Sequence, residues 1–248
     1  MNNFYSDNIY ILYQNDNEVE RIVNYIKYIH ENIDFDFKYE LIKASPIEDF
    51  DNSKYDRTKE YSNDYLNECL KKYIDYTLNS NQVSHIRSIR KILLDAIKNN
   101  YSSITLLEYD IYFHKQIKEL LPKYKNLINN CDIIYLGSSQ TFWYNPINLS
   151  KIEFTRNKDF SYYKSNHSLG TFGIILKKNV FKEYLKTLEL FLFSSDIVLS
   201  ITSRQFTSVV LYPNLVMCDI SKSSILNNRD LNRTYIKFKW NIKNYILN

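Results

Sequence analysis

Two carboxylates stand one residue apart at the end of an apolar run in the middle of the chain. Residues 104–107 (ITLL) lead directly into Glu108, Tyr109 and Asp110. Side chains of a β-strand alternate between its faces, so Glu108 and Asp110 can face one point. Ligands of open α/β sheets bind at the carboxyl ends of strands, where paired carboxylates can hold Mg²⁺ or Mn²⁺ with substrate phosphates. The sequence therefore predicts a metal site at Glu108 and Asp110.

The same pair has a simpler interpretation, because two carboxylates with this spacing often occur by chance. They would then be solvated side chains of a loop. A metal-dependent nuclease is disfavoured, since the pair has no Lys and no further carboxylate close to it in the sequence. What surrounds the pair therefore decides between a metal site and a loop.

Strand and helix patterns alternate around the acidic pair. Apolar periodicity and turn residues predict strands at 8–13, 35–42, 104–108, 132–136, 170–176, 206–211 and 215–218. The same criteria predict helices at 16–33, 61–78, 84–99, 114–121, 179–192 and 196–204, with Ser84 capping the third and Pro122 ending the fourth. Residues 44–59 and 138–168 are expected to be loops. The alternation predicts an α/β fold with a mixed, mostly parallel sheet flanked by helices.

Composition limits the function classes. The chain of 248 residues is 44% hydrophobic and 16% aromatic, which indicates one generous folded domain. A net charge of +4 is too small for a dedicated nucleic-acid binder. Neither GxGxxG nor GxxxxGK[ST] occurs, which disfavours the usual dinucleotide fold and a P-loop NTPase.

Cysteine usage and apolar run lengths bear on location. The three cysteines, Cys69, Cys131 and Cys218, form no metal-ligand or disulfide pattern, which indicates a reducing compartment. No signal-peptide pattern and no membrane-length apolar run is found, so a cytoplasmic protein is expected. Heavy use of Asn, Lys, Ile and Tyr is typical of an AT-rich genome, such as that of a large DNA virus or an AT-rich microbe. A viral origin would place the protein in the host cytoplasm or the virion.

An ordered set of motifs resembles glycosyltransferase family 25, which includes lipopolysaccharide-modifying enzymes and collagen galactosyltransferases. No single motif is decisive, and the matches follow one another through most of residues 8–220. They are the weak opening match at 8–21, Ser84-His85 before an amphipathic helix, Asn99-Asn100-Tyr101, the strand and acidic motif at 104–110, and the segments 132–137, 170–176, 195–196 and 212–216.

The resemblance implies a GT-A-like nucleotide-diphospho-sugar transferase domain over residues 1–220, followed by a tail, 221–248, that packs on it. It implies Mn²⁺ or Mg²⁺ on Glu108 and Asp110, a donor such as a UDP-sugar, and a hexose transferred to a hydroxyl of a glycan or protein. Tyr109 departs from the family, which carries a second Asp there. The departure leaves a second interpretation open, a catalytically weakened protein that binds a sugar nucleotide or glycan, and a third, a structural or interaction protein.

The resemblance also implies roles for four further residues. Asp196 would be the base that accepts the proton of the acceptor hydroxyl, with a helix cap as its alternative. His85 would lie near the nucleotide or metal, and its alternative is local packing at a helix start. Gly170 and Thr171 would let the donor sugar approach the backbone.

Weaker candidates lie in less regular stretches. His167 could approach the site, the aromatic residues 142–144 could stack on a sugar or base, and Arg229 and Arg233 could clamp a diphosphate. Ordinary packing or solvation is the competing interpretation for each. Gly137 and Gly173 are interpreted as turn or close-packing glycines. The sequence gives no expectation for the oligomeric state.

Overall fold

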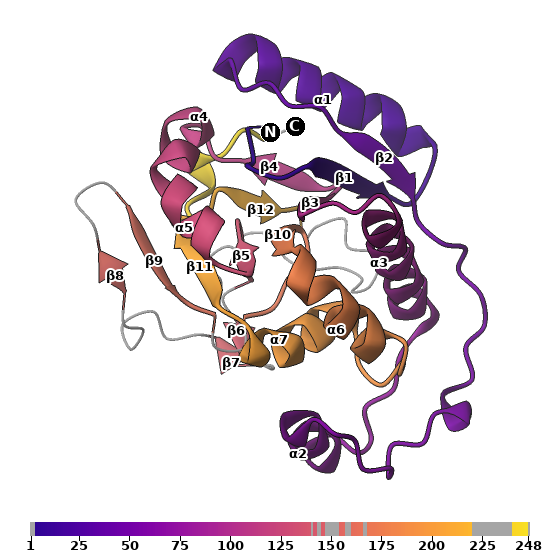
Figure 1. The fold of residues 1–248 in the computed structure, drawn as a ribbon. Helices are drawn as coiled ribbons and strands as arrows, with labels where there is room; N and C mark the ends of the chain where they lie inside the picture. The colour runs from indigo at the N-terminus through magenta and orange to yellow at the C-terminus, as the bar shows by residue number, and fades with distance from the viewer. Residues whose placement is uncertain are drawn as a thin grey trace.

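The protein has a central sheet between two layers of helices (Figure 1). The computed structural model describes residues 3–139, 141–142, 145–146, 154–156, 160–165, 168–219 and 240–247. Its order of elements alternates between strands and helices through most of that length. The α/β class expected from the sequence is confirmed.

The central sheet holds eight strands in the described part of the chain, in the order β2-β1-β3-β10-β5-β11-β9-β8. Only β10 and β9 run against the other six, because β10 is antiparallel to both of its neighbours and β9 is antiparallel to β11 and β8. The expected mostly parallel sheet is therefore confirmed. The strands are β1 (Asn8–Tyr13), β2 (Glu40–Lys43), β3 (Ser103–Glu108), β5 (Ile133–Tyr135), β8 (Thr155–Arg156), β9 (Ser161–Lys164), β10 (Gly173–Lys177) and β11 (Ser208–Tyr212).

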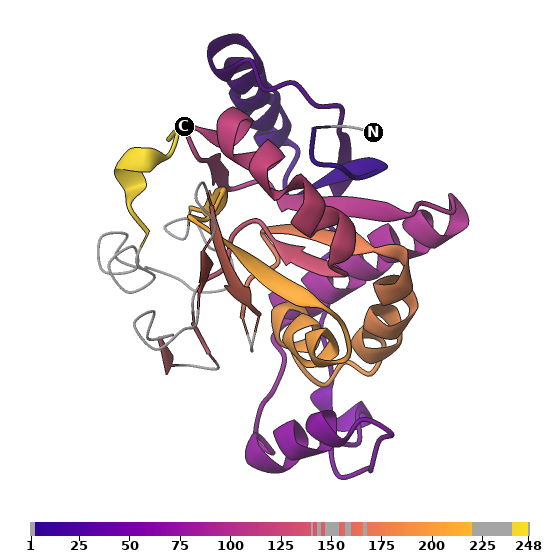
Figure 2. The same cartoon turned by 60° about the vertical axis from the view of Figure 1, so that its left-hand side comes forward.

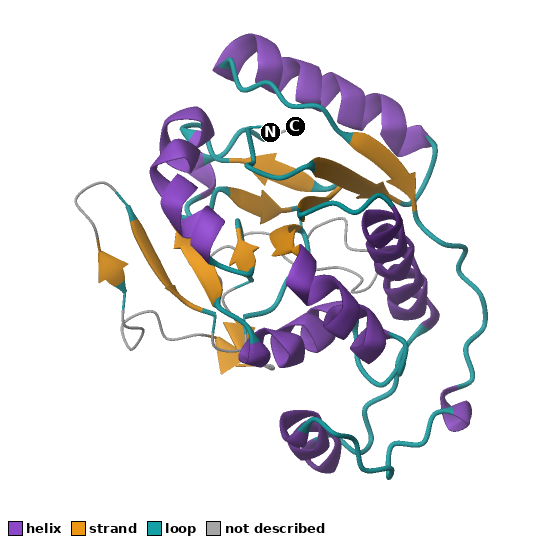
Figure 3. Cartoon of the chain, in the orientation of Figure 1, coloured by secondary structure: helices purple, strands orange, loops and turns teal. Residues whose placement is uncertain are grey.

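Each face of the sheet is covered by its own set of helices (Figure 3). On one face lie α1 (Asn17–Ile33), α4 (Ile117–Leu120) and α5 (Lys125–Asn130), and on the other α3 (Ser80–Lys98), α6 (Lys178–Leu188) and α7 (Ser195–Thr202). The strands serve both cores because successive side chains point to opposite faces. In β1, for example, Ile9 and Ile11 join the first core, whereas Tyr10 and Leu12 join the second.

Short elements complete the fold. A two-stranded ribbon pairs β4 (Ile111–Phe113) with β12 (Val216–Cys218), and a second pairs β6 (Thr141–Phe142) with β7 (Asn145–Pro146).

The expected helix at 114–121 is wrong at both ends, since α4 begins at Ile117 and Pro122 lies within a following 3₁₀ turn, η2 (Leu121–Tyr124). Pro is tolerated in a first helical turn, where its missing N–H needs no partner. The other short helices are η1 (Asn52–Lys54), α2 (Asp64–Lys72), η4 (Ser203–Gln205) and η6 (Ile242–Asn244).

Helix α3 begins one turn earlier than the sequence suggested. Asn79 caps it, because its side chain accepts from the Gln82 N–H while the Gln82 side chain accepts from the Asn79 N–H. This reciprocal pair is a capping box. Ser84, the expected cap, lies inside the helix, and its hydroxyl donates to the carbonyl of Ser45 at 2.5 Å. The correction places His85 in the second turn of α3.

Residues 45–79 leave the sheet after β2 and return at the start of α3. This excursion, which carries α2, extends below the sheet in Figure 2. Its first residue is tied to α3 twice, because the Ser45 N–H also donates to Ser88 Oγ at 2.8 Å. Farther along, the Arg57 guanidinium donates to the carbonyls of Leu192 and Tyr73. The excursion is thereby fastened to α3 and to the loop before α7.

The described part of the tail packs on the body of the protein. Tyr245 donates its hydroxyl to the carbonyl of Asn214 at 2.7 Å, and Tyr25 donates to the carbonyl of Ile246 at 3.0 Å. Residues 220–239 lie outside the described residues, so the expected boundary between 220 and 221 stays a prediction. None of the helices in the described ranges combines the length and apolar character that crossing a bilayer requires.

Gly137 follows β5 where β12 passes close to the sheet. A Cβ on Gly137 would lie 1.9 Å from the carbonyl oxygen of Val216, which is backbone and cannot swing away. At Gly173 the nearest atoms to an added Cβ are side-chain carbons of Val216 at 3.1 Å. Both positions are therefore close-packing glycines, and Gly137 has far less room.

We expect Gly137→Ala to destabilise the protein by about 3 kcal/mol or more, because the backbone of β12 must shift to admit the methyl group. Gly173→Ala should cost less, since a side chain can adjust by a few tenths of an ångström. Urea unfolding followed by circular dichroism gives both free energies. Equal losses in the two variants would contradict the packing described for β12.

Candidate functional site

A pocket of about 80 Å³ opens at the carboxyl ends of β1, β2 and β3. Its walls are residues 12–14, Ala44 after β2, the first turns of α3 at Asn81, Ser84 and His85, and residues 108–110 after β3. Parallel strands place their carboxyl ends at one edge, where the loops that follow them form a crevice. The neighbours Glu108 and Asp110 are thus brought together with His85, which lies on a different element.

Glu108 is the last residue of β3, and one of its carboxylate oxygens is held by two partners. The Thr171 hydroxyl donates to Oε1 at 2.8 Å, and His85 Nε2 lies 3.2 Å from the same oxygen. Thr171 is near because β10 pairs with β3 in a register that sets Gly173 opposite Leu107. Burial opposes the ionised form, yet His85 and the Thr171 hydroxyl together hold the pKa of Glu108 below its usual range.

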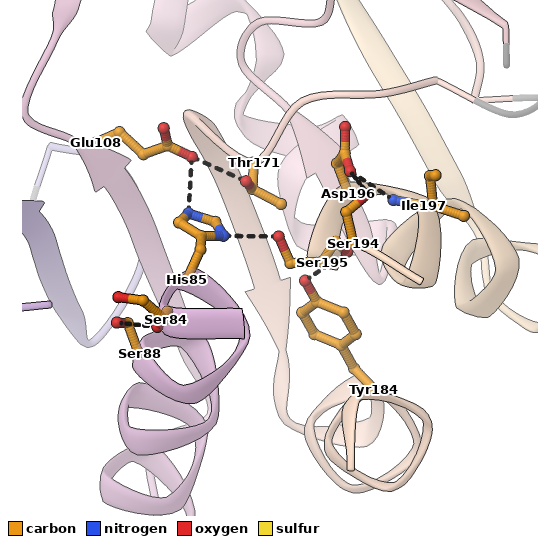
Figure 4. A network of polar contacts seen from close by, with 10 residues as sticks. All are labelled: Ser84, His85, Ser88, Glu108, Thr171, Tyr184, Ser194, Ser195, Asp196 and Ile197. Atoms are coloured by element: carbon orange, nitrogen blue, oxygen red, sulfur yellow. Dashed lines mark hydrogen bonds and ion pairs between the residues drawn. The ribbon is translucent and has the colours of Figure 1, made fainter. Parts of the chain in front are cut away.

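His85 connects Glu108 to the start of α7 (Figure 4). Its Nδ1 lies 2.7 Å from Ser195 Oγ, and its side chain is 17% exposed. Burial lowers the pKa of the ring, but Glu108, followed by Asp196, more than offsets this and raises the pKa above its ordinary value. The Ser195 carbonyl in turn accepts from the buried Tyr184 hydroxyl at 3.0 Å. A chain of contacts therefore runs from α6 through α7 and α3 to the end of β3.

Ser195, His85 and Glu108 are the residue types of a hydrolase triad, but their arrangement does not suit that chemistry. Ser195 is 4% exposed and does not line the pocket. A nucleophilic serine has to reach the substrate carbonyl. The contact between Ser195 and His85 therefore holds the imidazole in place and provides no attacking oxygen.

Asp110 lies in the turn between β3 and β4, beyond the last residue of the strand. It lines the pocket, yet its Oδ1 is inaccessible to solvent and has no hydrogen-bond partner on another described residue. Burial, followed by the neighbouring Glu108 charge, raises the pKa of Asp110 well above its ordinary value. The two carboxylates thus have opposite environments, one stabilised by donors and one unsatisfied.

Tyr109, the departure from the family motif, is oriented by α1. The Arg21 guanidinium donates to the Tyr109 carbonyl at 3.2 Å, and its Cζ lies 5.5 Å from the centre of the Tyr109 ring. Such a distance allows a cation–π contact. The Tyr109 side chain thus has a partner of its own on α1, apart from the donors that hold Glu108.

Asp196 is engaged within its own helix turn. Its Oδ1 accepts from the Ser194 hydroxyl at 2.6 Å and from the Ile197 N–H at 2.9 Å, and the residue does not line the pocket (Figure 4). Ser194 occupies the cap position. The contacts are those of a residue that stabilises a helix start, and a role as base stays a prediction.

The remaining candidates divide between described and undescribed residues. Thr171 contacts Glu108, and Gly170 adopts a φ of 110°, in the left-handed region that favours glycine. His167, residues 143–144, Arg229 and Arg233 lie outside the described residues, as does the side chain of Phe142. The part of the chain that is described contains no group of three or more His, Cys, Asp or Glu residues able to hold a metal ion.

Ser195 is the residue of the polar network around Glu108 that sequence patterns missed. It appeared only as the neighbour of Asp196, and its partner His85 is 110 positions away in sequence. Strand and helix periodicity carry no information about such a contact. The weak signal available was a hydroxyl residue next to a candidate base.

Comparison with known proteins gives no matching protein-family model. No curated protein matches the chain. Among solved structures, the chain is similar to the crystal structure of A197 from STIV, with 12% identity over 90% of this chain and 94% of that chain and a TM-score of 0.41. A TM-score of this size does not show a shared fold, so the description of fold and site rests on the features above.

We expect charge removal at the two carboxylates to change stability in opposite directions. Asp110→Asn should raise the free energy of unfolding at pH 7 by about 1 kcal/mol, because a carboxyl whose pKa is raised in the folded state opposes folding at neutral pH and the amide does not. Glu108→Gln should lower it by about 2 kcal/mol, because the ion pair with His85 is lost.

Thermal and urea unfolding of both variants measure these changes, with Glu48→Gln as a control that removes an exposed ion pair with Arg87. The control should change stability by less than about 1 kcal/mol. A loss of stability in Asp110→Asn as large as in Glu108→Gln would contradict the different environments of the two groups.

Proposed function

We propose that this protein is a metal-dependent glycosyltransferase that moves a hexose from a nucleotide-diphospho-sugar, such as a UDP-sugar, to a hydroxyl of a glycan or protein. The proposal combines the ordered motif resemblance with the α/β fold and the pocket at the carboxyl edge of its parallel strands. The function has to be argued from the site, because one fold serves many activities.

One observation carries the proposal. Asp110 keeps a carboxylate oxygen buried and without a hydrogen-bond partner among the residues that the structure describes, beside the charge of Glu108. Native proteins seldom leave a buried polar group unsatisfied, and titratable groups with strongly shifted pKa values are concentrated at binding and catalytic sites. A cation that binds between the two groups would neutralise both, which gives a reason for their proximity.

The residues present suit a divalent cation held partly by its substrate. Two carboxylates line the pocket, and one Glu108 oxygen has no hydrogen bond or ion pair in the described part of the chain. Mg²⁺ commonly takes one or two protein carboxylates and completes its shell with water and substrate phosphates. When bound, such an ion stabilises the charge that develops on the departing diphosphate.

The protein side chains would have separate tasks. Glu108 and Asp110 would bind the cation, and His85 would contact the donor. Thr171 does not line the pocket and would act through its hydrogen bond to Glu108. Asp196 would accept the proton of the acceptor hydroxyl if substrate binding frees its Oδ1 from Ser194 and Ile197.

A second function is a protein that binds a sugar nucleotide without transfer. Two observations favour it. Tyr109 stands where the family has an acidic residue, and the Asp196 carboxylate accepts hydrogen bonds from its own helix turn. Donor binding with no transfer to any acceptor and no hydrolysis would support this alternative.

We expect Mn²⁺ to make the melting temperature rise by several degrees for one nucleotide-sugar in a panel of donors, because ligands stabilise the folded state they bind. Glu108→Ala and Asp110→Ala should abolish that shift and reduce donor turnover by roughly 100-fold or more. Circular dichroism checks that both variants remain folded.

The control is Glu48→Ala, which removes an exposed carboxylate that does not line the pocket and should leave the shift and the turnover unchanged. Wild-type turnover in both site variants would contradict the site. A wild-type protein that binds no donor with or without metal would overturn the proposed function.

A further inference from the structure

Glu108 is restrained more tightly than an ordinary strand-end carboxylate. Its Oε1 accepts from the Thr171 hydroxyl at 2.8 Å, and the same oxygen lies 3.2 Å from His85 Nε2 (Figure 4). No hydrogen bond or ion pair of Oε2 is found among the described residues. The hydrogen bond from Thr171 and the ion-pair contact with His85 restrict the rotation of the carboxylate, and they leave the other oxygen available.

The position of His85 depends in turn on residues of α7 and α6. His85 cannot turn freely because Ser195 Oγ is 2.7 Å from Nδ1, and Ser195 is itself 4% exposed. The Tyr184 hydroxyl of α6 donates to the Ser195 carbonyl at 3.0 Å, which fixes the first turn of α7. Thr171, 4% exposed, sits just before β10, whose ladder with β3 sets its position.

We infer that Ser195, acting through His85, and Thr171 are positioning residues that present the free oxygen of Glu108 to the cation. This inference rests on the proposed function, because it assumes that Glu108 binds a metal ion. Neither hydroxyl touches the cation. Each acts by holding the ligand residue, in the way that carboxylate ligands of metal sites are oriented by outer hydrogen bonds.

The inference assigns separate consequences to the two hydroxyls. Without the Thr171 hydroxyl, Oε1 keeps only the His85 contact, and the carboxylate can rotate about its last bond. Without the Ser195 hydroxyl, the imidazole loses the partner that sets its ring orientation and tautomer. In both cases the carboxylate remains present but is less well oriented.

The test is Mn²⁺ affinity of the full chain in the presence of UDP, measured by the electron paramagnetic resonance signal of free Mn²⁺. We expect Thr171→Val and Ser195→Ala each to weaken Mn²⁺ binding by roughly 10- to 100-fold, the usual effect of losing an outer hydrogen-bond partner of a metal ligand. Thr171→Ser, which keeps a hydroxyl, should restore affinity to within about threefold of the wild type.

Matched controls remove the same groups elsewhere in α7 and the turn after it. Thr202 donates to the Val198 carbonyl at 2.9 Å and Ser203 to the Ser200 carbonyl at 2.8 Å, away from the pocket. Thr202→Val and Ser203→Ala should leave Mn²⁺ affinity unchanged. Their melting temperatures, compared with those of the site variants, separate an effect on metal binding from a general loss of stability.

The outcomes are distinguishable. If the wild type binds Mn²⁺ and both site variants bind it equally well, or the controls weaken it as much, the positioning role is overturned and the proposed function stands. If Thr171→Ser fails to restore affinity, the Thr171 hydroxyl has no such role. If the wild type binds no Mn²⁺ with UDP, the proposed function fails and the inference fails with it.

Discussion

The structure around the pocket depends on how two neighbouring carboxyl groups are kept at the end of one buried strand and in the turn after it. Glu108 is tolerated because a histidine and a hydroxyl stabilise its charge, and Asp110 is not compensated in the same way. A folded chain can keep an unsatisfied group only when the rest of the fold supplies the stability that it costs. Here two large cores, one on each face of the sheet, supply that stability.

Glu108 contacts His85 of α3 and Thr171 before β10, and His85 in turn contacts Ser195 of α7. The topology of the sheet explains why these segments meet. Strand β10 is inserted antiparallel between β3 and β5, so the segment before it arrives at the edge where β3 ends. Helix α6 continues from β10, and α7 follows, which sets Ser195 next to the second turn of α3. A single reversed strand thus brings together residues from distant parts of the chain.

Sequence patterns could predict the elements better than the contacts between them. The apolar run of β3 and its terminal carboxylate followed from periodicity, but Asp110 reached the pocket through a turn and not through strand alternation. Asn79 and Gln82 fit a capping box in the sequence, yet the predicted cap of α3 is Ser84, because Ser84 stands nearer to the apolar positions of the helix. Residues 35 and 37 alternate like a strand, but both pack around Phe4 and only β2 pairs with the sheet. No local pattern encodes the contact of His85 with Ser195, since it exists only once the sheet has formed.

The excursion at 45–79 leaves and re-enters the fold on one helix. Its first residue is bound by Ser84 and Ser88, and its last, Asn79, caps the same helix about one turn earlier. The two ends of this insertion therefore meet at a fixed place, whatever the chain does between them. Because the entropy of closing a loop rises slowly with its length, evolution can lengthen, shorten or exchange this segment without altering the strand ends. The fold thus separates an excursion whose length can change from the frame that holds the two carboxyl groups.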